Sequence, residues 1–212
     1  MMKIFDVTVP ITNSMAVWPG DPAVNNHLVA AIENGDEANV TAIHMSAHTG
    51  THIDAPRHFV ENGDGIESLH LSTLLGEVEV VEIDSNVDHI DVDTLAGLNK
   101  ERWKTRVLFK TRNSRLRLIE KQSFDQAFTA LLPEAANYLV NQGVKLVGID
   151  YLSIAPFENG MDTHLAFLKN NVIVIEGLNL SDVSAGIYNL IALPILLENG
   201  DGAPARVLLI QS

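Results

Sequence analysis

The chain has 212 residues, 46% of them hydrophobic and 19% charged, and no low-complexity run interrupts it. A chain of this length and composition can bury a sizeable apolar core, which excludes a disordered polypeptide, and we expect a single domain over residues 1–212. The 14 Lys and Arg residues and the 27 Asp and Glu residues give a formal net charge of -13. This charge would repel a phosphate backbone and an anionic membrane surface, so we expect no nucleic acid and no membrane among the partners.

The sequence contains no cysteine. Disulfides, thiolate metal sites and a cysteine nucleophile are therefore excluded, and any bound metal must be held by nitrogen and oxygen ligands. The first residues lack the apolar stretch of a signal peptide, and no apolar run approaches the ~20 residues of a membrane span. These features predict a cytoplasmic protein.

Strand-like segments outnumber helical ones along the chain. Alternating or continuous apolar patterns predict strands at 3–11, 76–84, 106–111, 144–150 and 172–176. Two further apolar segments follow at 188–197 and 205–210. Helices are expected at 133–141, with Pro133 in the first turn and Gly143 beyond the end, and at 162–169, with Asp162 as the N-cap. Because helix and strand alternate between residues 133 and 176, we expect a mixed α/β sheet architecture in one domain.

Two local features stand outside this pattern. Residues 15–22 carry Pro19, Gly20 and Pro22 around Trp18, which predicts a turn that fixes one large aromatic ring, suited to cover a pocket. Basic residues gather between residues 100 and 121, where a solvated surface, a local anion-binding patch and an interface all stay open.

Histidines cluster in one short segment. Four of the eight histidines fall within fifteen residues, at His44, His48, His52 and His58, together with Asp54. The even spacing of the first three would align them on one face of a helix and equally on one face of a strand. The residue types between them have to distinguish these two cases.

An extended segment is favoured because Gly50, the threonines beside it and Pro56 disfavour a helix. On an extended chain His48, His52 and Asp54 point the same way. Imidazole nitrogens and a carboxylate oxygen suit zinc, manganese or iron, and three protein ligands leave coordination positions open for water and substrate. Gly50 lies between the two histidines on that face, where we expect any side chain to crowd the metal.

The segment His48-Thr49-Gly50-Thr51-His52-Ile53-Asp54-Ala55-Pro56-Arg57-His58 resembles the signature of the cyclase-like metal-dependent hydrolases, a family that includes bacterial kynurenine formamidase. The resemblance is complete over 48–58, and weaker matches extend over nearly the whole chain. They lie at 5–10, 18–20, 148–150, 164, 175–178 and 190–194. The resemblance implies a fold of the swivelling β/β/α type and a homo-oligomer such as a homodimer.

The resemblance also implies a metal site. By it, His48, His52 and Asp54 bind a first ion, Asp54 bridges to a second, and His164 with Glu176 complete the second site. We expect zinc, with manganese as the alternative, and up to two ions per chain. Glu176 stands out from the residues alone, because it ends an otherwise apolar strand where a buried acid needs a partner.

Two ions roughly 3.5 to 4 Å apart can share a water molecule and lower its pKa beside a polarised carbonyl. His58 is then the candidate proton carrier for the leaving amine, the role that the resemblance implies for it, since an unperturbed imidazole has a pKa of about 6.5. The resemblance places Trp18 against the substrate. His44 is a candidate partner for the other nitrogen of a ligating histidine, and an ordinary histidine satisfied by its neighbours is the alternative.

We therefore expect hydrolysis of a C–N amide bond in a small-molecule substrate by metal-activated water. N-formyl-kynurenine, from tryptophan catabolism, is the family's best-known substrate, and a cyclic amide such as isatin is the alternative. After 148–150 the chain continues Tyr151-Leu152-Ser153-Ile154, where kynurenine formamidases carry a small polar residue and proline. A metal-holding binding protein without turnover and a cyclase that joins rather than cleaves are the rival interpretations.

Overall fold

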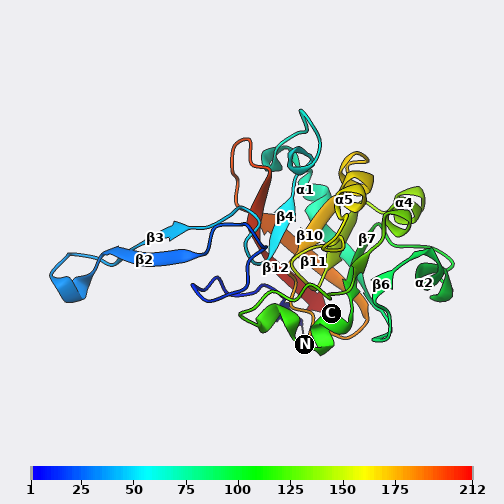
Figure 1. Cartoon of the computed structure of the whole chain (residues 1–212), viewed down its shortest axis with the longest axis horizontal. Coiled ribbons are helices and arrows are strands. Elements are labelled where there is room, and N and C mark those ends of the chain that lie inside the picture. The colour runs from blue at the N-terminus through cyan, green and yellow to red at the C-terminus, as the bar shows by residue number, and fades with distance from the viewer. Residues whose placement is uncertain (1, 212) are drawn as a thin grey trace.

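The computed structural model describes residues 2–211, and its main feature is an eight-stranded sheet that curves into a barrel-like shape (Figure 1). In spatial order its strands are β1 (Lys3–Asp6), β12 (Gly202–Gln211), β11 (Gly186–Pro194), β5 (Leu75–Glu82), β7 (Arg106–Lys110), β9 (Leu146–Ile149), β10 (Ile173–Glu176) and β4 (His52–Asp54). β4 pairs with β10 on one side and with β12 on the other, so the sheet closes on itself.

Parallel and antiparallel pairs are both present. β5, β7, β9 and β10 form a parallel block, and the other pairs of this sheet are antiparallel. The mixed α/β fold expected from the sequence is thereby confirmed. The strand predicted at 3–11 is shorter than expected. β1 ends at Asp6, well before Pro10, which has no backbone N–H to donate to a neighbouring strand.

The helices are short and surround the sheet. They are α1 (Leu71–Leu74), α2 (Val92–Gly97), α3 (Arg112–Arg115), α4 (Pro133–Asn141) and α5 (Met161–Leu168), with 3-10 turns η1 (Ile32–Asn34), η2 (Pro56–His58), η3 (Ile66–Ser68) and η4 (Leu118–Glu120). Pro133 occupies the first turn of α4, as predicted. The N-cap predicted for α5 is wrong: the cap is Gly160, and Asp162 lies inside the first turn, where a negative charge still suits the helix dipole.

The two faces of β10 belong to different apolar clusters. Ile173 and Ile175 pack in one buried cluster, whereas Val174 packs in the other, which also takes buried residues from α4 and α5. Because side chains alternate along a strand, Glu176 shares the face of Val174. The last residue of β10 therefore lies under α5, at the end of an apolar strand.

A long hairpin projects from the body of the molecule (Figure 1). It is formed by β2 (Asn25–Ala30) and β3 (Val40–His44), which pair only with each other within the described residues, and we call residues 25–44 the arm. A further two-stranded sheet joins β6 (His89–Ile90) to β8 (Ala130–Leu131). The arm was not predicted, because its polar and apolar residues do not alternate regularly.

Some members of the basic cluster between residues 100 and 121 pair with acids, and others bond to backbone carbonyls. Lys104 lies 2.7 Å from Glu77, and Lys100 and Arg112 also form ion pairs with carboxylates. This pattern favours the surface interpretation of the cluster. Among residues 2–211, no helix has the length and apolar character needed to cross a membrane.

Candidate metal centre

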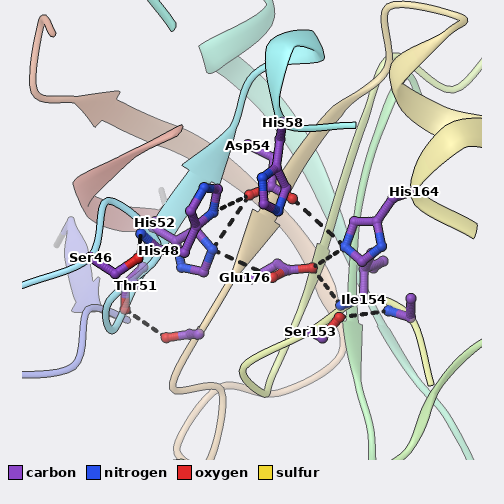
Figure 2. Close-up of polar contacts among 12 residues, drawn as sticks. Ser46, His48, Thr51, His52, Asp54, His58, Ser153, Ile154, His164 and Glu176 are labelled. Atoms are coloured by element: carbon purple, nitrogen blue, oxygen red, sulfur yellow. Dashed lines mark hydrogen bonds and ion pairs between the residues drawn. The ribbon is translucent and has the colours of Figure 1, made fainter. Parts of the chain in front are cut away.

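Two strands bring acids and histidines to one face of the sheet. β4 and β10 are antiparallel, with Glu176 opposite His52 and Val174 opposite Asp54. Residues opposite each other in such a pair point to the same face, so His52, Asp54 and Glu176 all point toward α5. His164 of α5 completes the group from above, as Figure 2 shows.

His48 reaches this group from a turn rather than from a strand. The prediction of one extended segment through residue 56 is wrong in detail: β4 covers only His52–Asp54, and Gly50 before it has a left-handed φ of 68°. The glycine permits the turn that swings His48 back over β4. A Cβ at Gly50 would lie 2.8 Å from the Ile11 side chain. A side chain at this position would therefore clash with an apolar neighbour rather than crowd a metal, contrary to our expectation.

The side chains converge on the Asp54 carboxylate (Figure 2). Its Oδ1 lies 3.0 Å from His48 Nδ1 and 3.4 Å from His52 Nε2, and its Oδ2 lies 3.8 Å from His164 Nε2. Glu176 spans the same group, with Oε2 at 3.4 Å from His52 Nε2 and Oε1 at 3.2 Å from His164 Nε2. The Ile154 backbone N–H also donates to Glu176 Oε1, at 2.6 Å.

Backbone carbonyls fix the orientation of two of the imidazoles. His52 Nδ1 lies 2.9 Å from the Gly50 carbonyl oxygen, and His164 Nδ1 lies 3.1 Å from the Gly160 carbonyl oxygen. A carbonyl can only accept, so each Nδ1 donates in these bonds. Each Nε2 is thus directed toward Asp54 and Glu176, in the arrangement that a metal-binding histidine requires.

The side chains of the centre are buried, and some of their polar atoms lack hydrogen-bond partners. Asp54 is 0%, His52 1%, Glu176 4% and His164 6% exposed. Within this group, His52 Nε2 and Asp54 Oδ2 have no hydrogen-bond partner among the described residues. Unpaired buried polar atoms are costly, and a cation between them would satisfy both. The donor set therefore fits a metal ion.

Two trios of ligand atoms have mutual distances within 4.8 Å. One contains His52, Asp54 and Glu176, and the other contains His48, Asp54 and His58. Asp54 is common to both, which suits a carboxylate that bridges two positions. The five residues predicted to bind metal are thus brought together in the structure, and His58 lies beside them.

The electrostatics of the centre are dominated by its carboxylates. Burial lowers the pKa of His52, but the carboxylates of Asp54 and Glu176, each 3.4 Å from its Nε2, outweigh it and raise that pKa to about 10. Burial raises the pKa of Asp54, yet His48 and His52 hold it well below its usual range. The site thus attracts positive charge strongly.

His58 lies at the edge of the centre. Its ring stacks on His48 with centroids 3.9 Å apart, and its Nδ1 lies 3.7 Å from Asp201 Oδ2. Burial lowers the pKa of His58, although the charge of Asp54 acts in the opposite direction. A half-buried imidazole with a lowered pKa is neutral near pH 7 and able to accept a proton.

Asp201 was missed by the sequence reasoning. Its Oδ2 lies 3.0 Å from His48 Nε2, in the loop that joins β11 to β12. The partner role considered for His44 is wrong, because His44 lies exposed at the end of β3 in the arm and makes no side-chain contact with His48. The one signal for Asp201 was an acid flanked by Gly200 and Gly202 between two apolar segments.

A cavity of about 310 Å³ opens beside the centre. His48, His58, His164 and Glu176 line one part of it, Asp21 and Ser153 add polar groups, and aromatic and apolar side chains line much of the rest. These include Trp18, Phe59, Leu152, Phe157 and Met161. Trp18 packs edge-on against Phe124, with ring centroids 5.1 Å apart, so the predicted turn does place its indole at this cavity.

The barrel-like sheet and this cluster of histidines and carboxylates define a metal-dependent hydrolase. The chain belongs to the Cyclase family, whose model, described as "Putative cyclase", matches residues 5–156. It is 37% identical to cyclase-like protein 3 of Arabidopsis thaliana, with 99% of this chain and 80% of that protein covered. It is 34% identical to kynurenine formamidase of Salinibacter ruber, with 98% of this chain and 97% of that protein covered.

Solved structures agree with this membership. A potential metal-dependent hydrolase with cyclase activity is 37% identical and superimposes with a TM-score of 0.86, covering 100% of this chain and 99% of that one. Isatin hydrolase A from Labrenzia aggregata, at 23% identity, has a TM-score of 0.82 and covers 99% of this chain and 93% of its own. At that identity the likeness concerns the fold.

Proposed function

We propose that this protein hydrolyses the C–N bond of an aryl amide with water activated by divalent metal. One observation carries the proposal: His52 Nε2 and Asp54 Oδ2 are buried and unpartnered, and their neighbours Glu176 and His164 line an aromatic cavity. A purely structural histidine cluster would satisfy these atoms internally. An open cavity beside them admits a substrate, which a storage site for metal does not need.

The proposed ligand assignment follows the family resemblance, and it differs from the two trios, which group Glu176 with His52 and His58 with His48. His48, His52 and Asp54 would hold a first ion, because both imidazoles lie near Asp54 Oδ1. His164 and Glu176 would hold a second ion together with Asp54 Oδ2. Nitrogen and oxygen donors of this kind suit zinc, with manganese as the alternative. When bound, such ions would polarise a carbonyl and lower the pKa of water, so that hydroxide is available to attack the carbonyl carbon.

His58 would carry the proton to the leaving amine. It lines the cavity, and its stacking on His48 holds the ring beside the centre. Its lowered pKa lets it take a proton from water near pH 7 and release it to the amine nitrogen as the C–N bond breaks. Asp201, 3.7 Å from His58 Nδ1, would orient the ring and stabilise its protonated form.

The proposed substrate is N-formyl-kynurenine or a close aryl formamide. Support comes from the similarity to a kynurenine formamidase over nearly the full length of both chains. The rings of Trp18, Phe59 and Phe157 line the cavity and suit a flat aniline ring. Isatin carries an amide bond on an aryl nitrogen within a ring, so it is the second substrate to test.

We propose further that residues 1–212 act as one domain and that this domain forms a homodimer through the arm. β1 and β12, from the two ends of the chain, pair in one sheet, which supports the first point. In the arm, the apolar residues Val29 and Ile43 are 61% and 63% exposed. A two-stranded hairpin alone is only marginally stable in water. A second copy would cover these side chains.

An assay of the zinc-loaded and the chelator-treated protein tests the proposed function. The substrates are N-formyl-kynurenine, unsubstituted formanilide and isatin. We expect the zinc-loaded protein to hydrolyse at least one of the two formamides and the chelated protein to lose this activity, with recovery when zinc or manganese is returned. A protein that binds zinc tightly yet cleaves none of the three would instead be a metal-holding protein without turnover.

A further inference from the structure

A tight turn joins Trp18 to an acid that also lines the cavity. The Asp21 backbone N–H donates to the Trp18 carbonyl, at 3.0 Å, and Gly20 has a φ of 102°. Pro19 and Gly20 occupy the two central positions of this turn, the residue types that a type II turn prefers there. The Cα atoms of the first and last residues of such a turn lie within about 7 Å of each other, and both Trp18 and Asp21 line the cavity.

No Lys or Arg side chain lines the cavity within the described part of the chain. Its lining residues include the acids Asp21 and Glu176. Metal ions would compensate the charge of Glu176, which belongs to the centre. The carboxylate of Asp21 would then be the negative charge left without a counterion, since no ion pair or side-chain hydrogen bond joins it to another described residue.

We propose that Asp21, together with the Trp18 ring, binds a protonated amine carried by the substrate. The inference rests on the proposed function and adds the charge of the substrate to it. An ammonium group next to a carboxylate gains a charge-assisted hydrogen bond, and the face of an indole attracts the same cation. A carboxylate on the substrate would meet repulsion at this position, in a chain whose formal net charge is -13.

Three formanilides test the proposal on the zinc-loaded protein. They differ only in the group that ends an ortho-ethyl side chain, which is an ammonium, a hydroxyl or a carboxylate. We expect kcat/KM for the ammonium compound to exceed that for the hydroxyl compound by about tenfold, mainly through a lower KM, because a carboxylate and an indole face each attract a cation about threefold at a partly exposed site. The carboxylate compound should be the poorest substrate.

The variant Asp21→Asn should lower the ratio between the ammonium and hydroxyl compounds to about threefold, the share of the Trp18 ring, and Asp21→Glu should restore part of the loss. Asp93→Asn is the matched control: it removes the same charge from an exposed position in the first turn of α2 and should keep the wild-type ratio. A wild-type protein without preference for the ammonium compound overturns the proposal. Equal ratios in wild type and Asp21→Asn, or equal losses in Asp21→Asn and Asp93→Asn, also overturn it.

A binding measurement separates this inference from the proposed function. If none of the formanilides is hydrolysed, the proposed function fails, and binding then decides the role of Asp21. Calorimetry with the anilines that carry the ammonium or the hydroxyl side chain uses the same zinc-loaded proteins. Tighter binding of the ammonium compound by wild type, reduced in Asp21→Asn, supports the inference; equal binding of both compounds contradicts it.

Discussion

Glu176 and His52 lie directly opposite each other in the antiparallel pair of β10 and β4. This register places a carboxylate and an imidazole on one face of the sheet, 3.4 Å apart at their nearest atoms. Two residues further along, the pair of Val174 and Asp54 sets Asp54 on the same face. A shift by one residue would turn Glu176 away from the centre, so the register of two short strands determines whether the site exists.

Gly177 should be essential to this register. It follows Glu176 with a φ of 70°, and a Cβ there would lie 2.1 Å from the Gly50 carbonyl oxygen. We expect Gly177→Ala to lower the free energy of unfolding by about 3 kcal/mol or more, because backbone must move. Gly143→Ala is the control, since Gly143 also has a positive φ but open space around it, and it should cost about 1 kcal/mol. Urea unfolding of both variants measures the difference, and equal losses would refute the packing argument.

His58→Ala should separate catalysis from metal binding. If His58 carries the proton, the variant keeps its metal and loses at least about a hundredfold in kcat, the low end for acid–base catalysis. The metal content and the rate are measured on the same sample. Loss of metal in His58→Ala would make His58 a ligand, as its place in a trio with His48 and Asp54 permits. Wild-type rates would remove it from the mechanism.

Asp150 should be a structural acid outside the centre. Its buried Oδ2 accepts from the backbone N–H groups of Thr111 and Ser114, at 2.7 and 3.0 Å, and Oδ1 accepts from Thr111 Oγ1 and Asn113 Nδ2. Asp150→Asn would turn one oxygen into a donor that faces donors. We expect a loss of about 3 kcal/mol in the free energy of unfolding.

The exposed change Asp93→Asn serves as the control for Asp150→Asn and should stay within about 0.5 kcal/mol of wild type. Thermal and urea unfolding compare the two variants. An Asp150→Asn protein as stable as the control would mean that the four hydrogen bonds of Asp150 contribute nothing net.

The stability of the metal-free protein should depend on pH through His52. Burial lowers its pKa, but Asp54 and Glu176 raise it from 6.5 to about 10 in the folded protein. A group with a raised pKa contributes fully below the unfolded value of 6.5, and the contribution disappears as the pH rises toward about 10. With chelator present, the free energy of unfolding should fall across this window.

His52→Gln lacks the titrating group and should show a smaller fall over the same window. Zinc-loaded wild type should also show a smaller fall, because a ligating imidazole is already neutral. Denaturant unfolding at several pH values measures each slope. A free energy of unfolding that rises with pH in the chelated wild type would contradict the assigned pKa direction.

The local elements could largely be predicted, because periodicity and turn residues act over short distances. The strand ending at Glu176 and the helix beginning at Pro133 are examples. The clustering of His48, His52 and Asp54 was also visible, since all three lie within seven residues. The turn at Gly50 was not predicted, because the threonines beside it favour extended backbone.

Long-range relationships could not be predicted from one sequence. His48 and Asp201 are 153 positions apart, and no local pattern links them. The arm was missed for a related reason: its strands face no core, so they lack the alternation that marks a half-buried strand. His44 was a candidate partner of a ligating histidine, yet it lies on the arm.

The metal content of purified protein tests the central claim most directly. Wild type, reloaded with zinc or manganese and then dialysed, should retain metal when measured by plasma mass spectrometry. Asp54→Asn keeps the shape of the side chain but removes the charge shared by both trios, and it should retain at least about tenfold less, since losing even an outer partner of a ligand costs about 10- to 100-fold in affinity. Wild-type protein that retains no metal, or a folded Asp54→Asn variant that retains as much as wild type, would contradict the account.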